Sequence, residues 1–283
     1  MPYSYRETVK SDVSDELINT YLLRPIAGAI VRLLYATPVR PNHVTIAATL
    51  AGLAAAMFYT RGTAEAFVIA GLLVTVKDVL DSADGQLARA KKTYSRFGRF
   101  LDSIGDFIVN VAVFGAIGWT LYAASGRLSM ILLSAAGFIG LTLRVSYHVY
   151  YQAHFLHLGQ TYENNRITEE VRPEDRTGDR ATLTLQRTFQ FLYGWQDRLM
   201  LRLDRWSRSG LELDGAGSVR WYGDHTALRL GSFLGPGTEL FLLMLCSVAG
   251  RLELYLWLNL GLMNGVLLVA WAYRRYGLRR AMI

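Results

Sequence analysis

The chain has 283 residues, of which 52% are hydrophobic and only 19% are charged. Because soluble proteins average about 25% charged residues, this balance favours a membrane protein. The formal charge of +7 does not indicate nucleic-acid binding, since the basic residues lie beside apolar runs rather than on a stripe of a polar domain. The single cysteine, Cys246, excludes an intramolecular disulfide and a cysteine-based zinc site.

Residues 1–41 are predicted to form a cytoplasmic segment that ends in a helix lying on the membrane surface. The start of the chain is polar and acidic, where a cleaved secretory signal would have a basic start and an apolar stretch, so no cleaved signal is expected. Between residues 15 and 36, apolar faces alternate with four charged residues: Asp15, Glu16, Arg24 and Arg32. This pattern favours an amphipathic interfacial helix, and Pro25 is expected to divide it.

Several apolar runs approach the roughly 20 residues that span a bilayer. The candidate spans cover approximately residues 42–60, 64–84, 98–122, 128–150, 229–249 and 252–273. The predicted fold class is therefore an all-α integral membrane protein, with a transmembrane domain of six helices over residues 42–273.

Lysine and arginine residues indicate the orientation of these helices, because cytoplasmic loops carry the excess. They gather in the connection 89–99 and in the tail 274–283, whereas the opposite connections offer only three arginines: Arg61, Arg127 and Arg251. We therefore expect a multi-pass protein with both termini and the 89–99 connection on the cytoplasmic side.

The polar segment 151–228 is predicted to be a cytoplasmic insertion between the fourth and fifth spans. Within it, apolar residues recur every three or four positions: Leu185, Phe189, Leu192, Trp195, Leu199, Leu203 and Trp206. Arginines fall mainly elsewhere around the same helix: Arg187, Arg198, Arg202 and Arg205. This basic amphipathic helix has two open interpretations, packing on the protein's own cytoplasmic surface or lying on anionic lipid.

Four aspartates stand at or near the ends of the second and third spans: Asp81, Asp84, Asp102 and Asp106. Each pair is three or four residues apart, so each projects from one face of its helix toward a common space. Charged side chains near hydrocarbon normally face a protein interior and serve a function. Four like charges would repel one another unless cations neutralised them, and oxygen ligands favour magnesium, manganese or calcium.

Cations held by carboxylates commonly complete their coordination with phosphate oxygens, so the aspartates indicate phosphoryl-type chemistry. Gly85 and Gly98 would permit close backbone approach to a nucleotide, and Arg89 could bind phosphate. Each feature alone has a structural interpretation, as a helix cap, a packing glycine or an inside-positive anchor. Their combination within 81–106 favours the functional one.

Residues 81–106 read D-x-x-D-G-x-x-A-R, eight further residues, and G-x-x-x-D-x-x-x-D. This resembles the signature of the CDP-alcohol phosphotransferase family, integral membrane enzymes of phospholipid synthesis, and the segment RPNHVT at 40–45 is similar to the opening of that family's first span. The resemblance implies a protein with six transmembrane helices, usually a homodimer in that family, in which the four aspartates hold two magnesium or manganese ions. It also implies that Asp106 is the general base and that Gly85, Ala88, Arg89 and Gly98 bind the CDP moiety.

Five further residues are weaker candidates for the site. Asn42 and Thr45 could line the nucleotide pocket or start a helix. Asp78 could support the metal ligands or pair with Lys77. Arg144 and His148 could meet an anionic acceptor, or could be a snorkelling arginine and an interfacial histidine.

The predicted reaction is transfer of a phosphatidyl group from CDP-diacylglycerol to a hydroxyl acceptor with release of CMP. One alternative within the family is transfer of phosphocholine or phosphoethanolamine from a CDP-alcohol to diacylglycerol. An alternative of another class is a cation-coupled transporter, against which the clustering of the aspartates beside a basic loop argues. The expected partners are the CDP-linked substrate, the acceptor, membrane lipids and a second copy of the chain, without nucleic acid.

Overall fold

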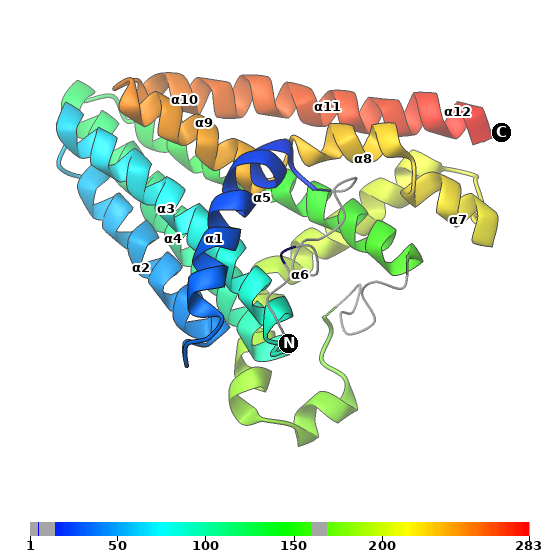
Figure 1. Cartoon of the computed structure of the whole chain (residues 1–283). Helices are drawn as coiled ribbons and strands as arrows, with labels where there is room; N and C mark the ends of the chain where they lie inside the picture. Colours follow the sequence, from blue (N-terminus) through cyan, green and yellow to red (C-terminus); the bar gives the residue numbers. More distant parts are fainter. Residues whose placement is uncertain (1–4, 6–14, 160–168, 283) are drawn as a thin grey trace.

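A computed structural model describes residue 5 and residues 15–159 and 169–282, and among these residues every regular element is a helix (Figure 1). The predicted all-α class is confirmed. Most of residues 1–14, and residues 160–168 of the predicted insertion, lie outside the described residues. The main α-helices are α1 Arg24–Leu34, α2 Pro41–Tyr59, α3 Ala64–Ala90, α4 Arg96–Ser125, α5 Ser129–Leu158, α6 Arg180–Arg208, α7 Gly215–Tyr222, α8 His225–Ser232, α9 Pro236–Val248, α10 Leu252–Leu258, α11 Asn264–Ala272 and α12 Arg279–Met282.

Helices α2, α3 and α4 run side by side, and α2 packs against both of the others (Figure 1). Helix α3 also contacts α1 and α9, and α4 contacts α5. The shared core is apolar and includes the fully buried side chains of Tyr59, Ile117, Leu243 and Tyr255. A β-carbon at Gly71 of α3 would lie 2.9 Å from Cβ of Ser247, so this glycine allows α3 and α9 to approach closely.

Three short turns join the long helices at the end of the bundle away from the aspartates. Gly62, Gly126 and Gly250 stand in them with φ values of 70°, 68° and 64°, a left-handed conformation that glycine adopts without steric cost. Arg127 of the second turn donates to Glu253 beside the third at 2.8 Å. The turns therefore lie together at one end of the helix bundle.

Five segments of the described chain are long and apolar enough to cross a membrane: Pro41–Tyr59, Arg96–Ser125, Ser129–Leu158, Gly215–Val248 and Leu252–Met282. They overlap five of the six predicted spans. The remaining one corresponds to α3, whose apolar sequence is interrupted by Lys77, Asp78, Asp81 and Asp84. A multi-pass membrane protein is supported, and the count of six spans stays a prediction. The last span is a nearly continuous rod in which π-helical turns, Asn259–Met263 and Tyr273–Leu278, connect α10, α11 and α12.

The helix predicted over residues 15–36 is present, and its division at Pro25 takes the form of a change in helix type. A π-helical turn, Asn19–Leu23, passes directly into α1, where proline is the second residue. Proline lacks an N–H group and is tolerated in the first turn of a helix. The buried Arg24 pairs with Asp15 at 2.5 Å, which ties the two parts together.

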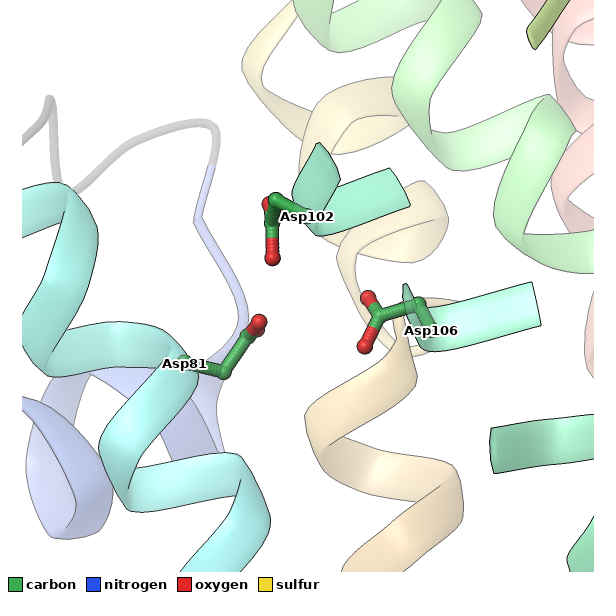
Figure 2. A group of neighbouring side chains, drawn as sticks. All are labelled: Asp81, Asp102 and Asp106. Atoms are coloured by element: carbon green, nitrogen blue, oxygen red, sulfur yellow. The ribbon is translucent and has the colours of Figure 1, made fainter. Parts of the chain in front are cut away.

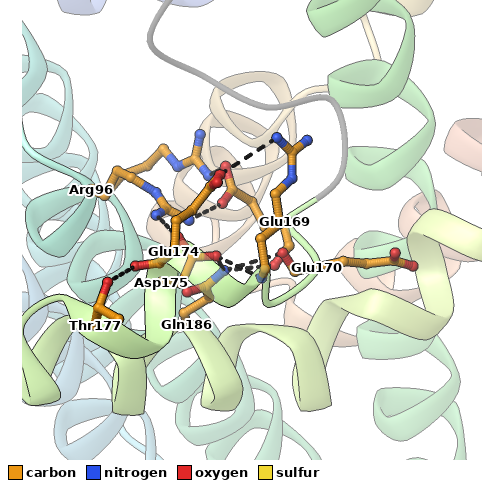
Figure 3. Close-up of polar contacts among 9 residues, drawn as sticks. Arg96, Glu169, Glu170, Glu174, Asp175, Thr177 and Gln186 are labelled. Atoms are coloured by element: carbon orange, nitrogen blue, oxygen red, sulfur yellow. Dashed lines mark hydrogen bonds and ion pairs between the residues drawn. The ribbon is translucent and has the colours of Figure 1, made fainter.

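The segment predicted as an insertion contains the expected long helix, α6, which packs against α4 and α5. A short 3₁₀ helix, Pro173–Thr177, is fixed to the start of α4 by charged contacts (Figure 3). Arg96 donates to Asp175 at 2.6 Å and to Glu169 at 2.7 Å, and Gln186 of α6 donates to Asp175 at 3.0 Å. This network holds the segment over the helix that carries Asp102 and Asp106.

Candidate functional site

Helices α3 and α4 meet at the site, and side-chain caps set where both begin. The Thr63 hydroxyl accepts from the N–H of Ala66 at the start of α3, and the Ser95 hydroxyl accepts from the N–H of Gly98 at the start of α4. Only residues 91–95 separate the two helices. The carboxylates near the end of α3 are thereby brought opposite those in the first turns of α4.

Three of the four predicted aspartates form a cluster. Asp81 of α3 points toward Asp102 and Asp106 of α4 (Figure 2), and one carboxylate oxygen from each lies within 4.8 Å of the others. All three residues are half-buried. Carboxylate oxygens that converge from two helices are the ligands that hard divalent cations prefer.

Lys77 lies one helical turn before Asp81 and brings a positive charge into the cluster. Its ammonium forms an ion pair with Asp106 and lies 3.9 Å from an oxygen of Asp81. The Lys77 side chain is only 6% exposed, so the carboxylates face a cation within the protein. The sequence interpretation considered Lys77 only as a partner for Asp78, and the spacing of four between Lys77 and Asp81 is the signal that could have found its role.

Asp84, the fourth predicted ligand, is buried and lies outside the group of three. Its carboxylate accepts a hydrogen bond from the Thr45 hydroxyl of α2 at 2.5 Å. Thr45, considered for the nucleotide pocket, therefore touches the signature directly. Asp78 is also buried, at 7% exposure, next to Lys77 in the sequence.

The glycines of the signature lie against side chains of this same region. A β-carbon at Gly98 would lie 2.8 Å from Oδ1 of Asn42, which brings the start of α2 onto the start of α4. The guanidinium of Arg89 lies along the same helix against Gly85, with Nη1 3.5 Å from where a β-carbon would stand. Ala88 is buried. The structure thus brings Asn42 and Arg89 beside the glycines with which the sequence analysis grouped them.

Arg144 and His148 are both buried in α5. The two Nη atoms of Arg144 donate to Asn264 of α11 at 2.7 Å and to Glu239 of α9 at 2.8 Å. These contacts connect helices within the bundle and give Arg144 a structural role, but its full burial differs from the snorkelling arginine that the sequence analysis considered. Glu239, which the sequence analysis did not single out, could have been noticed as a lone acid in the apolar run after Pro236.

Helix α6 contributes a further residue to the neighbourhood of the aspartates. The hydroxyl of Tyr193 donates to the carbonyl of Ser103, between the two aspartates of α4, at 2.9 Å. Burial raises the pKa of Tyr193, and the charges of Asp106 and Asp102 raise it further, so this tyrosine remains a neutral hydrogen-bond donor. Sequence spacing placed it on the helix but gave no reason to connect it with α4.

The residues present fit a divalent cation. The cluster offers an oxygen from each of Asp81, Asp102 and Asp106, and Lys77 already provides positive charge at two of these carboxylates. Oxygen-only ligands favour magnesium or manganese over zinc. In a helical protein with several apolar spans, this arrangement defines a membrane protein with a carboxylate site between two neighbouring helices.

Comparison with known proteins relates part of the chain to one family of membrane enzymes. Residues 38–166 match the family model described as CDP-alcohol phosphatidyltransferase, and this stretch includes all four aspartates. Residues 38–166 of the chain are thus similar to the CDP-alcohol phosphatidyltransferase family, the family that the signature at 81–106 predicted.

Three curated relatives show the range of similarity. The chain is 33% identical over 120 residues to a phosphatidylinositol phosphate synthase of Streptomyces avermitilis, covering 42% of this chain and 46% of that protein. It is 35% identical over 88 residues to an archaetidylinositol phosphate synthase of Pyrococcus horikoshii, covering 29% and 45%. It is 32% identical over 103 residues to a bifunctional IPC transferase and DIPP synthase of Thermococcus kodakarensis, covering 36% and 23%. The matched region thus spans less than half the length of each relative.

Proposed function

We propose that this protein transfers a phosphatidyl group from CDP-diacylglycerol to a hydroxyl acceptor and releases CMP. The observation that carries the proposal is the cluster of Asp81, Asp102 and Asp106 between α3 and α4, within the region that matches the family model. A half-buried carboxylate cluster suits a reaction in which cations and a diphosphate must meet at the membrane surface.

Within this proposal, the four signature aspartates hold magnesium or manganese, with two ions in the site. Bound metal would supply neutralisation of the diphosphate and of the departing CMP. The hydrogen bond from Thr45 fixes the carboxylate of Asp84. The CDP moiety is assigned to the remaining signature residues: Gly85, Ala88, Arg89 and Gly98.

Asp106 is the proposed general base. It accepts the proton of the acceptor hydroxyl as that oxygen attacks the phosphorus attached to the lipid, and the bond from this phosphorus to the CMP oxygen breaks. The ion pair with Lys77 supports the role, because a nearby ammonium favours the ionised form of a carboxyl group, which is the form that can accept a proton.

The acceptor is proposed to be an inositol phosphate. The names of two of the relatives, phosphatidylinositol phosphate synthase and archaetidylinositol phosphate synthase, motivate this choice. The site is proposed to open on the cytoplasmic side, in agreement with the arginines and lysines of residues 89–99. A homodimer is proposed by analogy with the family.

The test is CMP release by the purified protein in lipid vesicles, with CDP-diacylglycerol, magnesium or manganese, and a panel of inositol phosphate, glycerol phosphate and serine. We expect release that EDTA abolishes and that Asp106→Asn lowers by at least about 10²-fold, the usual contribution of a general base. Glu253→Gln, which alters an exposed acid at the other end of the bundle, is the matched control. CMP release only from CDP-choline or CDP-ethanolamine with diacylglycerol would instead support transfer of phosphocholine or phosphoethanolamine to diacylglycerol. Absence of metal-dependent release from every donor would overturn the enzymatic proposal in favour of cation transport.

A further inference from the structure

Helix α6 exposes large apolar side chains together with arginines. Phe191 is 83% exposed, Trp206 53% and Trp195 46%, and Leu199 is exposed as well. Four exposed arginines follow the first turn of the same helix: Arg187, Arg198, Arg202 and Arg205. We call these eight residues the outer face of α6. A contiguous exposed surface with this much aromatic area normally meets a partner or a membrane.

Six of the eight residues of the outer face lie on a basic edge and an apolar edge that run along the helix, and Phe191 and Arg202 lie between these edges. At about 100° per residue, Arg187, Arg198 and Arg205 fall within roughly 20° of one line along the helix. Trp195, Leu199 and Trp206 fall within roughly 40° of a second line, about 100° away from the first. Such a division suits a helix at a boundary between a charged and an apolar medium.

Four of the five buried residues of α6 are polar and the fifth is Met200, whereas a helix on a water-soluble protein buries mainly apolar residues. Gln186, Gln196, Asp204 and Ser207 are all at most 2% exposed. Each finds hydrogen-bond partners inside: Asp204, for example, accepts from Tyr151 of α5 at 3.1 Å and from Trp221 of α7 at 2.9 Å. A helix that buries amides and a carboxylate while it exposes Phe191 and Trp195 is stable where the outer side is not water.

The contacts of α6 place it at the depth of a membrane surface. Gln196 accepts a hydrogen bond from Ser146, Ser207 accepts one from Trp271, and Tyr193 donates one to the carbonyl of Ser103. Counted from the turns at the far end of the bundle, at Ser129, Leu252 and Ser125, these contact points are roughly 26, 28 and 33 Å along their helices at 1.5 Å per residue. The hydrocarbon core of a bilayer is about 30 Å thick, so α6 lies beside the bundle at the opposite boundary.

The apolar edge of α6 continues onto the last membrane span. The rings of Trp206 and Trp271 are stacked with centroids 5.0 Å apart, and the guanidinium of Arg275 lies 4.3 Å from the centre of the Trp206 ring. Tryptophan and arginine are the residues that concentrate at membrane boundaries. The surface of the span and the outer face of α6 therefore form one aromatic and basic boundary.

We propose that α6 is a membrane-interface helix whose outer face binds anionic phospholipid. Phe191, Trp195, Leu199 and Trp206 enter the boundary between headgroups and acyl chains, and the four arginines contact lipid phosphates. The basic charge of the face is complementary to an anionic headgroup. This inference is independent of the proposed activity, since its tests measure position and lipid binding.

The first test measures the depth of spin labels in vesicles that contain phosphatidylglycerol, with the full chain in a Cys246→Ser background. Labels at F191C and W195C are compared with a lipid-facing control, L132C, and a solution-facing control, T177C, both on exposed positions. We expect labels at 191 and 195 to collide with oxygen as at 132 and to be shielded from a water-soluble nickel complex at least about fivefold relative to 177. Access to nickel equal to that at 177 would overturn the proposal, and so would shielding from both reagents, which would indicate contact with a second copy of the chain.

The second test measures the preference of the purified protein for phosphatidylglycerol over phosphatidylcholine by native mass spectrometry of retained lipid. R198Q/R202Q is expected to lower this preference at least about twofold, because each arginine near an anionic surface adds attraction. R172Q/R176Q, which removes the same charge from exposed positions beside the solution-facing Thr177, is expected to leave it unchanged. An unaltered preference in R198Q/R202Q, or an equal loss in the control, would overturn the assignment of the arginines.

Discussion

The ammonium of Lys77 forms an ion pair with the carboxylate of Asp106 across the contact between α3 and α4, and it lies 3.9 Å from Asp81. One buried lysine thus partly neutralises two of the three clustered carboxylates. A divalent cation at the cluster would bind the same carboxylate oxygens. Lys77 and the metal would therefore both reduce the repulsion between the carboxylates.

Replacing Lys77 with methionine is expected to make the stability of the protein depend on metal. Removing one partner of a buried ion pair costs about 3–5 kcal/mol, so the melting temperature in EDTA should fall by several degrees. Magnesium should restore most of the loss in Lys77→Met and raise the melting temperature of the unaltered protein less. Thermal unfolding with and without magnesium measures both.

A double-mutant cycle with Asp106→Asn provides the control. If the pair is coupled, the loss in Lys77→Met/Asp106→Asn is smaller than the sum of the two single losses. Additive losses in EDTA would contradict a direct interaction.

The hydrogen bond from Thr45 to Asp84 gives a second prediction. Thr45→Val keeps the shape of the side chain but removes the donor from a buried carboxylate. Leaving a buried group unsatisfied costs about 1–3 kcal/mol, and we expect the magnesium concentration for half-maximal CMP release to rise. Thr75→Val is the matched control, because the Thr75 hydroxyl bonds only the carbonyl of Gly71 in its own helix. Equal metal requirements in the two variants would contradict the prediction.

Much of the helical framework follows from the sequence because apolar length and helix caps are local properties. The spacing that predicted α6 is an example, since the helix runs from Arg180 to Arg208 as the recurrence of apolar residues indicated. The burial of Lys77 and its choice of Asp106 as partner depend on the packing of α3 against α4, which no spacing within one helix specifies. The contact of Asn42 with Gly98 likewise joins two separate helices.

Helix α6 exposes much of its apolar stripe and buries polar side chains. The sequence alone could not predict this, and it left open whether the helix packs on the protein or lies on lipid. Trp195, Leu199 and Trp206 belong to the predicted apolar stripe, yet all three are exposed. Asp204 and Gln196, which the sequence analysis did not single out, are both buried by partners on α5 and α7. Helical periodicity identifies an apolar stripe on the helix, but contacts with neighbouring helices determine whether that stripe faces the protein interior or the outside.

Substitutions in the buried ion pair between Arg144 and Glu239 can distinguish a structural role of Arg144 from binding of the acceptor. Their side chains are 0% and 1% exposed, so Arg144→Met should leave Glu239 with an uncompensated charge and cost about 3–5 kcal/mol. Replacing both, as Arg144→Met/Glu239→Leu, should cost less than the two single changes together. A lower melting temperature with an unchanged KM for the acceptor supports the structural role. A raised KM at an unchanged melting temperature would instead support contact with the acceptor.

Asp197 of α6 gives a prediction of pH dependence. Burial raises its pKa to about 6, with Arg198 opposing the shift and Glu169 adding to it. Because the folded state then holds the proton more tightly than the unfolded state, ionisation of Asp197 destabilises the fold as the pH rises from about 4 to about 6. Asp197→Asn should therefore be more stable than the unaltered protein above pH 6, by at most about 3 kcal/mol for a shift of two pKa units, and the difference should vanish toward pH 4.

Asp179, at the start of the same helix, provides a comparison because its pKa is shifted in the opposite direction. It caps α6 by accepting from the N–H of Thr182 at 3.0 Å, and this bond lowers its pKa. Its stabilisation is therefore present above the ordinary aspartate pKa and is lost as the pH falls through the lowered value. Asp179→Ala should be less stable than the unaltered protein at neutral pH, and the difference should shrink in acid. Melting temperatures in detergent from pH 3 to 8 measure both variants, and parallel curves for the two would contradict the burial of Asp197, because opposite shifts must give opposite slopes.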